Sequence, residues 1–187
     1  MDNKKSYSLL LIALFLLLNL PAFASTRVFS TPYYKIELDS SMQTLRSVNG
    51  GPDNRPLVSY TYGSIYKNVE ASLTIQIVTF PPNELTNPER AQRQFIAGIV
   101  NGLQRRYNAE PVDKFTVFNK TKGVRLNNKE FKNFTYSTKN GIIEIFTITQ
   151  KDKLYCFVIS SYGKNAQSIN EINQSLIDKI AKIQMPN

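Results

Sequence analysis

Two segments in the second half of the chain carry apolar residues at both odd and even positions, and they constrain the fold more than any other feature. These segments are residues 142–148 and 154–159. Successive side chains of a β-strand point to opposite faces of its sheet, so strands of this kind are buried on both faces. Other parts of the chain must therefore pack against both faces of the sheet. We expect an α+β fold with a central antiparallel sheet of about six to seven strands and helices on both faces.

Three further segments predict strands of the same sheet. Residues 33–38 and 71–77 alternate between apolar and polar types, which is typical of a strand with one buried face. Residues 57–62 are rich in types that favour β-structure. All three precede the first predicted helix, so the sheet combines strands from both halves of the chain.

Turn residues separate these strands. Asn140-Gly141 is the strongest short-range signal for a hairpin, and it lies directly before one of the doubly apolar strands. Residues 46–56 contain a dense cluster of Asn, Gly, Pro and Asp, so we expect a loop there.

A first helix is expected to begin at Pro88, which suits the first helical position, with Asn87 as its cap. Gly98 and Gly102 lie one turn apart inside it, although glycine disfavours a helix interior. Close packing of the helix on the sheet would explain them, and a contact between two helices is the alternative. The apolar stripe of this helix comprises Phe95, Ile96, Ile99, Val100, Leu103 and Tyr107.

A second helix is expected over residues 165–185, near the end of the chain. Ser168 and Glu171 fit the spacing of a capping box. Its apolar stripe comprises Ile169, Ile172, Leu176, Ile177, Ile180 and Ile183.

Residues 1–24 have the three-part layout of a secretory signal peptide. Lys4 and Lys5 precede an apolar run over residues 9–20, and Ala22-Phe-Ala24 matches a signal-peptidase site. The run is short for a transmembrane span. We therefore expect an exported protein, periplasmic or secreted, whose mature form is a single globular domain over residues 25–187 with no transmembrane segment.

The chain contains no histidine and only one cysteine, which limits the kinds of catalytic and metal site that it can form. Ser-His-Asp and Cys-His catalysis and zinc sites built from His or Cys are excluded. Cys156 lies in a doubly apolar strand, where burial raises the pKa of a thiol and makes it unreactive. We assign no catalytic residue, no metal site and no cofactor.

Positive charge is concentrated between residues 105 and 139, within a chain whose net charge is +9. A basic surface there would bind anionic lipid or another polyanion, with peripheral membrane contact and no nucleic-acid partner expected. The alternative is a set of ordinary solvated strand faces. The candidate anion-binding residues are Arg105, Arg106, Lys120, Lys122, Arg125, Lys129, Lys132 and Lys139.

Two smaller groups are weaker candidates. Tyr60, Tyr62 and Tyr66 share one strand face and could stack on a ligand, although such rows are more often cross-strand pairs. Glu37 and Asp39 also share a face, and paired carboxylates can hydrolyse glycosides. The same two residues equally suit an ordinary solvent-facing strand.

The order of elements resembles the Mog1/PsbP-like fold. The resemblance rests on residues 124–131 (VRLNNKEF), on the hairpin at Asn140-Gly141, and on residues 153–160 (KLYCFVIS). Asn128 stands where the family usually has Gly, and Asn also adopts the left-handed conformation. The resemblance implies a non-enzymatic binding or accessory module with an unknown protein partner. Binding of anionic lipid is the alternative, and a carboxylate-dependent hydrolase is the weaker one.

Overall fold

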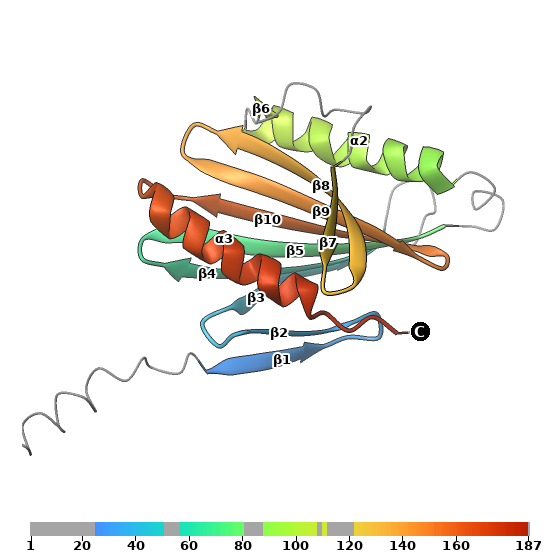
Figure 1. The fold of residues 1–187 in the computed structure, drawn as a ribbon, viewed down its shortest axis with the longest axis horizontal. Coiled ribbons are helices and arrows are strands. Elements are labelled where there is room, and N and C mark those ends of the chain that lie inside the picture. The colour runs from blue at the N-terminus through green and yellow to red at the C-terminus, as the bar shows by residue number, and fades with distance from the viewer. Residues whose placement is uncertain (1–24, 51–56, 81–87, 108–109, 112–121, 187) are drawn as a thin grey trace, which may run out of the picture.

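The computed structural model describes residues 25–50, 57–80, 88–107, 110–111 and 122–186 (Figure 1). The expected signal peptide, the cap at Asn87 and the candidate Lys120 lie outside the described residues. Among the described helices, none is both long and apolar enough to cross a membrane.

The main sheet is antiparallel, with the strand order β3-β4-β5-β10-β9-β8-β6 and with β7 paired to β8. Residues 142–148 and 154–159 fall in the adjacent strands β9 and β10, and β10 lies between β9 and β5, which confirms them as central strands. The strands are β3 (Gln43–Asn49), β4 (Leu57–Tyr66), β5 (Val69–Thr79), β6 (Glu110–Pro111), β7 (Lys122–Leu126), β8 (Lys129–Thr138), β9 (Gly141–Gln150) and β10 (Lys153–Tyr162).

Three of the described strands, β1, β3 and β6, were not predicted. Strand β1 (Thr26–Ser30) pairs with β2 (Lys35–Asp39) in a small separate sheet. The strand expected within residues 33–38 is therefore confirmed, but its placement in the main sheet is wrong. Strand β3 occupies part of the segment expected to be a loop. The loop prediction for residues 46–49 is therefore wrong. Most residues of β1 and β3 are exposed, so neither strand has the apolar alternation that predicts a half-buried strand.

The hairpin predicted at Asn140-Gly141 is confirmed, since β8 and β9 pair with Thr138 opposite Gly141. The turn itself is Lys139-Asn140, and Gly141 already belongs to β9. A Cβ atom on Gly141 would lie 2.2 Å from the Ser161 carbonyl oxygen, so close approach of strand β10 requires glycine there. Asn128 adopts a positive φ of 65° in the β7–β8 turn, as expected.

Helix α2 (Pro88–Tyr107) begins at Pro88 as predicted, whereas α3 (Ala166–Ala181) is shorter than expected. The N-cap of α3 is Asn165, whose Oδ1 accepts a hydrogen bond from the Ser168 backbone N–H at 3.1 Å. The predicted capping box of Ser168 and Glu171 is therefore wrong, because Ser168 already lies within the first turn. The Glu171 carboxylate instead pairs with Lys67 at 2.8 Å.

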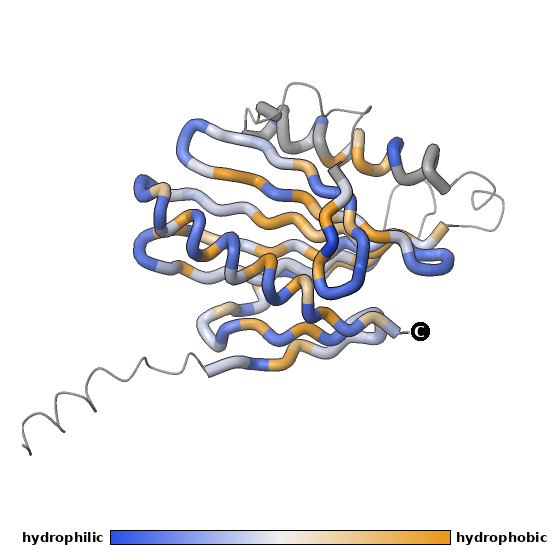
Figure 2. The backbone as a smooth tube through the Cα atoms, in the orientation of Figure 1, coloured by the Kyte–Doolittle hydropathy of each residue, from blue (hydrophilic) through white to orange (hydrophobic). Residues whose placement is uncertain are grey.

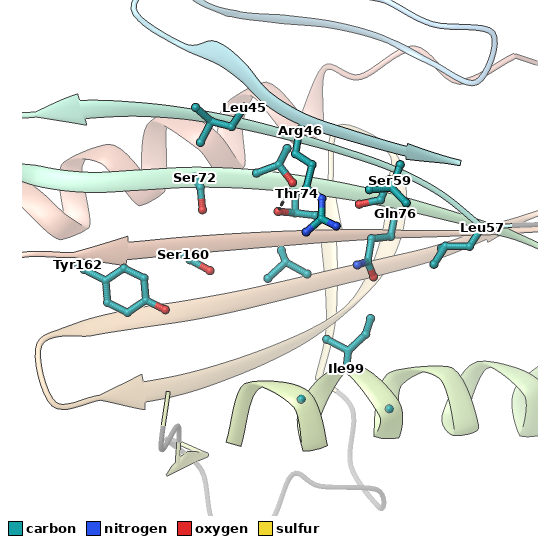
Figure 3. Close-up of a pocket in the computed structure, with 15 residues that line it drawn as sticks. Leu45, Arg46, Leu57, Ser59, Ser72, Thr74, Gln76, Ile99, Ser160 and Tyr162 are labelled. Carbon is teal, nitrogen blue, oxygen red and sulfur yellow. Dashed lines mark hydrogen bonds between the residues drawn. The ribbon is translucent and has the colours of Figure 1, made fainter. Parts of the chain in front are cut away.

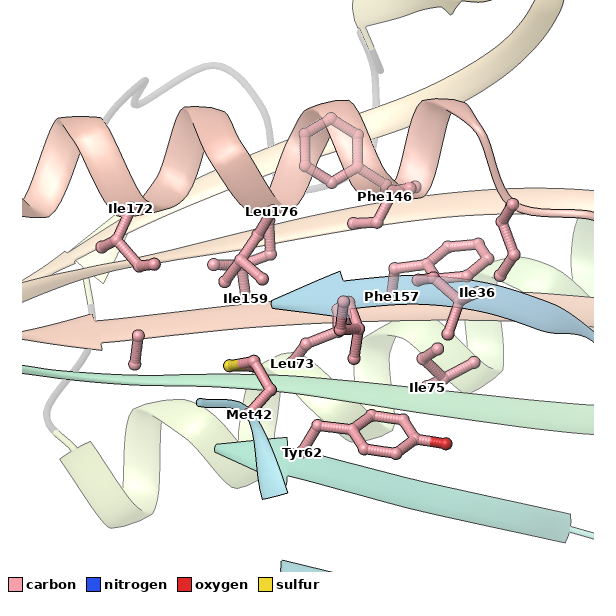
Figure 4. Packing of buried hydrophobic residues seen from close by; sticks show 14 of the residues in the cluster. Ile36, Met42, Tyr62, Leu73, Ile75, Phe146, Phe157, Ile159, Ile172 and Leu176 are labelled. Atoms are coloured by element: carbon pink, nitrogen blue, oxygen red, sulfur yellow. The ribbon is translucent and has the colours of Figure 1, made fainter. Parts of the chain in front are cut away.

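The larger core lies under α3, which contacts β10, β5 and β2. Ile172 and Leu176 of α3 meet Phe157 and Ile159 of β10, and Ile36 of β2 covers the same cluster (Figure 4). Hydrophobic residues concentrate in these central strands, and the turns are hydrophilic (Figure 2). We call this side of the sheet the α3 face.

The opposite face carries a second, smaller core. Cys156 and Val158 alternate along β10 with the residues of the α3 face, and they cluster with Ile143 of β9 and Ile96 of α2. Cys156 is fully buried, as the sequence predicts, and burial raises the pKa of its thiol to about 12. Where β4 and β5 form this face, it carries hydroxyl and amide side chains instead.

Candidate functional site

A pocket of about 740 Å³ lies between α2 and the opposite face of the sheet (Figure 3). Side chains of β4, β5 and β10 form its floor, β3 supplies one wall and α2 the other. A volume of this order is typical of pockets that hold small organic ligands, which measure roughly 300–1,000 Å³.

The floor of the pocket is made of small polar residues in register. Thr61 of β4 pairs with Thr74 of β5, which in turn pairs with Val158 of β10. The two threonine hydroxyls are 3.1 Å apart and hydrogen-bonded. Leu73 and Ile75, the neighbours of Thr74 along the chain, point into the core of the α3 face. Alternation along β5 thus gives one apolar side and one polar side.

The rows on either side of the threonine pair continue the polar floor. Ser59 pairs with Gln76 in one row, and Ser72 pairs with Ser160 in the other. Among the described residues, the buried Oε1 atom of Gln76 has no hydrogen-bond partner. A buried amide oxygen without a partner is unfavourable, so this atom would gain from a donor placed in the pocket.

A β-bulge in β3 shapes the wall opposite α2. The register of β3 against β4 shifts between Thr44 and Arg46, and both Leu45 and Arg46 line the pocket although they are consecutive. The Leu45 side chain lies over Gly63, where a Cβ atom would be only 2.4 Å from Leu45 Cδ1. The Arg46 guanidinium reaches over the floor beside Thr74 (Figure 3).

Among the described residues that line the pocket, Arg46 is the only charged one. It is exposed, and within the described parts of the chain no carboxylate pairs with it. The pocket therefore presents a guanidinium that can bind an anionic group bidentately, next to hydroxyl groups that can donate further hydrogen bonds.

Gly98, Ile99 and Gly102 form the wall contributed by α2. A Cβ atom on either glycine would meet nothing within 4 Å. The close packing predicted for these glycines is therefore wrong: they border open space, and their missing side chains leave the pocket unfilled.

The structure spreads the predicted basic residues over several elements. Arg105 and Arg106 lie in α2, Lys122 and Arg125 in β7, and Lys139 in the β8–β9 turn. Arg105, Arg125 and Lys139 are exposed. Arg125 lies opposite Glu130 in the β7–β8 ladder, which places a carboxylate beside this cation.

Lys129 and Lys132 are three residues apart on β8 and so point to opposite faces of the strand. Lys129 Nζ donates a hydrogen bond to the Ile183 carbonyl oxygen, and partial burial lowers the pKa of Lys129. Lys139 lies ten residues after Lys129, which corresponds to a distance of about 30 Å along an extended chain. These three lysines do not form one group, and anion binding by the basic residues stays a prediction.

The predicted tyrosine row lies on the α3 face. The Tyr62 hydroxyl is 2.7 Å from that of Tyr34, and its ring packs 4.6 Å from that of Phe29. The Tyr60 ring meets Tyr34 edge-on at 5.7 Å, and Tyr66 donates a hydrogen bond to Glu171 at 3.1 Å. These contacts are within the protein, and stacking on a ligand stays a prediction.

The two candidate carboxylates lie on β2, away from the pocket. Glu37 is exposed and accepts a hydrogen bond from the Thr26 hydroxyl. Asp39 Oδ1 is 3.5 Å from Lys179 Nζ of α3. The described residues contain no group of three or more Cys, Asp or Glu side chains placed to hold a metal ion.

Sequence reasoning missed the pocket, although one signal for it was present. The polar positions of β5 are Ser72, Thr74 and Gln76, which are small or uncharged where a solvent-facing strand more often carries charge. A polar face of this kind, with a glycine pair in the nearby helix, is a pattern that could have indicated a ligand site.

No family model and no curated protein matches this chain. Among solved structures, the chain is similar to cyanobacterial PsbP (CyanoP) from Synechocystis sp. PCC 6803, whose structure was determined in solution. The TM-score is 0.56 and the sequence identity 14%, over 88% of this chain and 95% of the cyanobacterial one. The resemblance to the Mog1/PsbP-like fold is confirmed, and at this identity the likeness concerns the fold alone.

Proposed function

We propose that this protein is a non-enzymatic accessory module that binds a small ligand in the pocket between α2 and strands β3, β4 and β5. The observation that carries the proposal is the pocket itself, with a polar floor, an arginine that no described carboxylate pairs with, and a helix wall that contains two glycines. Pockets with a few convergent polar groups are the usual sites of small-molecule binding.

The chemistry of the surrounding residues supports binding over catalysis. The Cys156 thiol is buried, and its raised pKa keeps it protonated at neutral pH. Glu37 and Asp39 lie on the β1–β2 hairpin and do not line the pocket. The described residues that do line it offer hydroxyl, amide and guanidinium groups, which recognise a ligand without supplying a general base.

We further propose that residues 1–24 direct export and that residues 25–187 form one domain, with α2 and α3 covering opposite faces of its sheet. The clusters around Ile96 and around Leu176 use alternate residues of β10, which supports this arrangement. Cell fractionation and N-terminal sequencing test the export step. A mature chain that begins at Ser25 outside the cytoplasm is expected, and an uncleaved cytoplasmic chain would contradict it.

A pocket-filling variant tests the binding function. A thermal-shift screen of small organic compounds would compare the protein with Gly98→Phe, which fills the pocket, and with Gly98→Ala as a matched control. Compounds that raise the melting temperature of the protein and of Gly98→Ala, but not of Gly98→Phe, are expected, because a ligand that binds only the folded state stabilises it. If every active compound also stabilises Gly98→Phe, the pocket is not the site.

Binding of anionic lipid is a second candidate function, favoured by the exposure of Arg105, Arg125 and Lys139. Flotation with neutral and anionic liposomes tests it at low and physiological salt, since exposed charges are screened at about 8 Å at physiological ionic strength. Arg125→Glu combined with Lys139→Glu should abolish flotation, whereas Arg46→Gln should leave it unchanged. Equal flotation with neutral liposomes would contradict this candidate.

A further inference from the structure

We propose that the ligand of the pocket is an amphiphilic organic acid, with a carboxylate or phosphate group bound by Arg46 and an apolar body lying against the walls. This inference rests on the proposed function, because it names the class of ligand for the same pocket.

The acidic group follows from the charge of the site. Among the described residues Arg46 is the single charged one of the lining, and none of the described carboxylates neutralises it. Its guanidinium lies beside Thr74, and the Thr61 hydroxyl is bonded to that of Thr74 on the same row of the floor. A neutral ligand would leave the guanidinium without a counter-charge, whereas a carboxylate or phosphate would accept two parallel hydrogen bonds from it.

The bulge in β3 is what directs this arginine to the site. Without the register shift after Thr44, consecutive residues of β3 would point to opposite faces, and only one of Leu45 and Arg46 would face the pocket. The bulge therefore places a cation and a large apolar side chain next to each other on one wall. This pairing matches a ligand that carries an acidic end and an apolar portion.

The apolar body follows from the remaining lining. Leu45 is 64% exposed, which leaves most of a leucine side chain in contact with water above the floor. Val48, Ile99 and Val158 add apolar surface on the two walls and the floor. Gly98 and Gly102 leave the space between these groups open. An apolar segment placed there would bury Leu45 and Ile99 together, and burial of apolar surface favours binding.

Gln76 provides an independent sign that the pocket receives a ligand. Its Oε1 atom is buried and, among the described residues, has no hydrogen-bond partner. Gln76 lies two residues beyond Thr74 on the same face of β5, at a distance of about 7 Å. A ligand whose hydroxyl or N–H group lies about this far from its acidic group would satisfy both Arg46 and Gln76.

Matched probes distinguish the acidic group from the apolar body. Calorimetric titrations would measure the affinity of the purified protein for decanoate, for 1-decanol as its neutral counterpart, and for inorganic phosphate as an anion without an apolar part. We expect decanoate to bind at least about tenfold more tightly than either of the other two, because only decanoate provides both features.

Three variants assign the effect to residues. Arg46→Gln should weaken decanoate binding by about tenfold or more and leave 1-decanol binding unchanged, since only the acid uses the charge. Arg125→Gln, which removes an exposed arginine from β7, should change neither. Gly98→Phe should weaken the binding of both probes, because it fills the space that they share.

Each other outcome is decisive. If decanoate and 1-decanol bind equally, or if Arg46→Gln does not weaken decanoate binding, the ligand is not recognised through its acidic group, while the binding function survives. If phosphate binds as tightly as decanoate, the inference that the ligand has an apolar body is wrong. If none of the three probes binds, the amphiphilic-acid proposal falls, and the compound screen with Gly98→Phe judges the binding function separately.

Discussion

Alanine at Gly98 and Gly102 is predicted to stabilise the protein. Glycine inside a helix is less favourable than alanine by about 0.5–1 kcal/mol, because glycine loses more backbone entropy on folding. The opposing cost would be a clash, and none arises here, since a Cβ atom on either glycine meets nothing within 4 Å. The double variant should therefore gain about 1–2 kcal/mol of unfolding free energy if the two effects add.

Urea denaturation measures this gain. With a slope of about 2 kcal/mol per molar urea, the midpoint of the double variant should rise by roughly 0.5–1 M. Hydrogen exchange at the amides of α2 should slow at the same time, which would show that the gain arises in this helix. Ligand binding should persist, because two methyl groups occupy little of a pocket of about 740 Å³.

Gly141 provides the matched control, since the same substitution is predicted to have the opposite sign there. A Cβ atom on Gly141 would lie 2.2 Å from the Ser161 carbonyl oxygen, so Gly141→Ala should cost about 1–3 kcal/mol through overpacking. A loss of stability in Gly98→Ala or Gly102→Ala would refute the reasoning. It would mean that these glycines pack closely against another element and that the pocket does not border them.

Three further predictions concern buried polar and ionisable groups. Tyr62→Phe should lower the free energy of unfolding by about 1–3 kcal/mol, because it leaves the buried Tyr34 hydroxyl without its partner. Tyr34→Phe should cost much less in the Tyr62→Phe background than in the unmodified protein. Urea denaturation of the four proteins of this cycle measures the costs, and strictly additive costs would show that the hydroxyl pair is unimportant. Burial raises the pKa of Glu144, so its ionisation opposes folding at neutral pH; Glu144→Gln should raise stability at pH 7, with the advantage shrinking as pH falls towards 4, and an unchanged difference over this range would contradict the assignment. Burial also raises the pKa of Cys156 from 9.0 to about 12, so its contribution to stability is complete below pH 9 and falls as pH rises towards 12. Between pH 8 and pH 10, Cys156→Val should therefore lose less unfolding free energy than the unmodified protein, as measured by denaturation at both pH values. Equal losses in the two proteins would contradict this prediction.

The fold was predictable where one strand or helix carries its own signal. Strands β9 and β10 are apolar at both parities because they are central, and Pro88 marks the start of α2 within the sequence itself. Strands β1 and β3 carry no such signal, since edge strands expose most of their residues. The cap of α3 was misassigned because Asn165 and Ser168 are both suitable caps, and only the backbone at Asn165 is extended.

The pocket was not predictable because its residues meet only through strand pairing. Arg46, Thr61, Thr74 and Val158 come from four strands and form one row across the sheet. Their alignment depends on the register of three strand pairs and on the bulge in β3, and a shift of one residue in any pair would send a side chain to the other face. The described basic residues between 105 and 139 illustrate the converse, since they are close in sequence but lie on α2, β7, β8 and the β8–β9 turn.

The difference between the two halves of the opposite face explains why a pocket forms where it does. On β9 and β10 this face carries Ile143, Ile145 and Val158, and Ile96 of α2 packs on them. On β4 and β5 it carries hydroxyl and amide groups, which gain nothing from contact with an apolar helix. Apolar packing therefore favours close contact of α2 with the sheet over β9 and β10, and not over β4 and β5. The open space over β4 and β5 therefore follows from the sequence of these two strands and is not a packing defect.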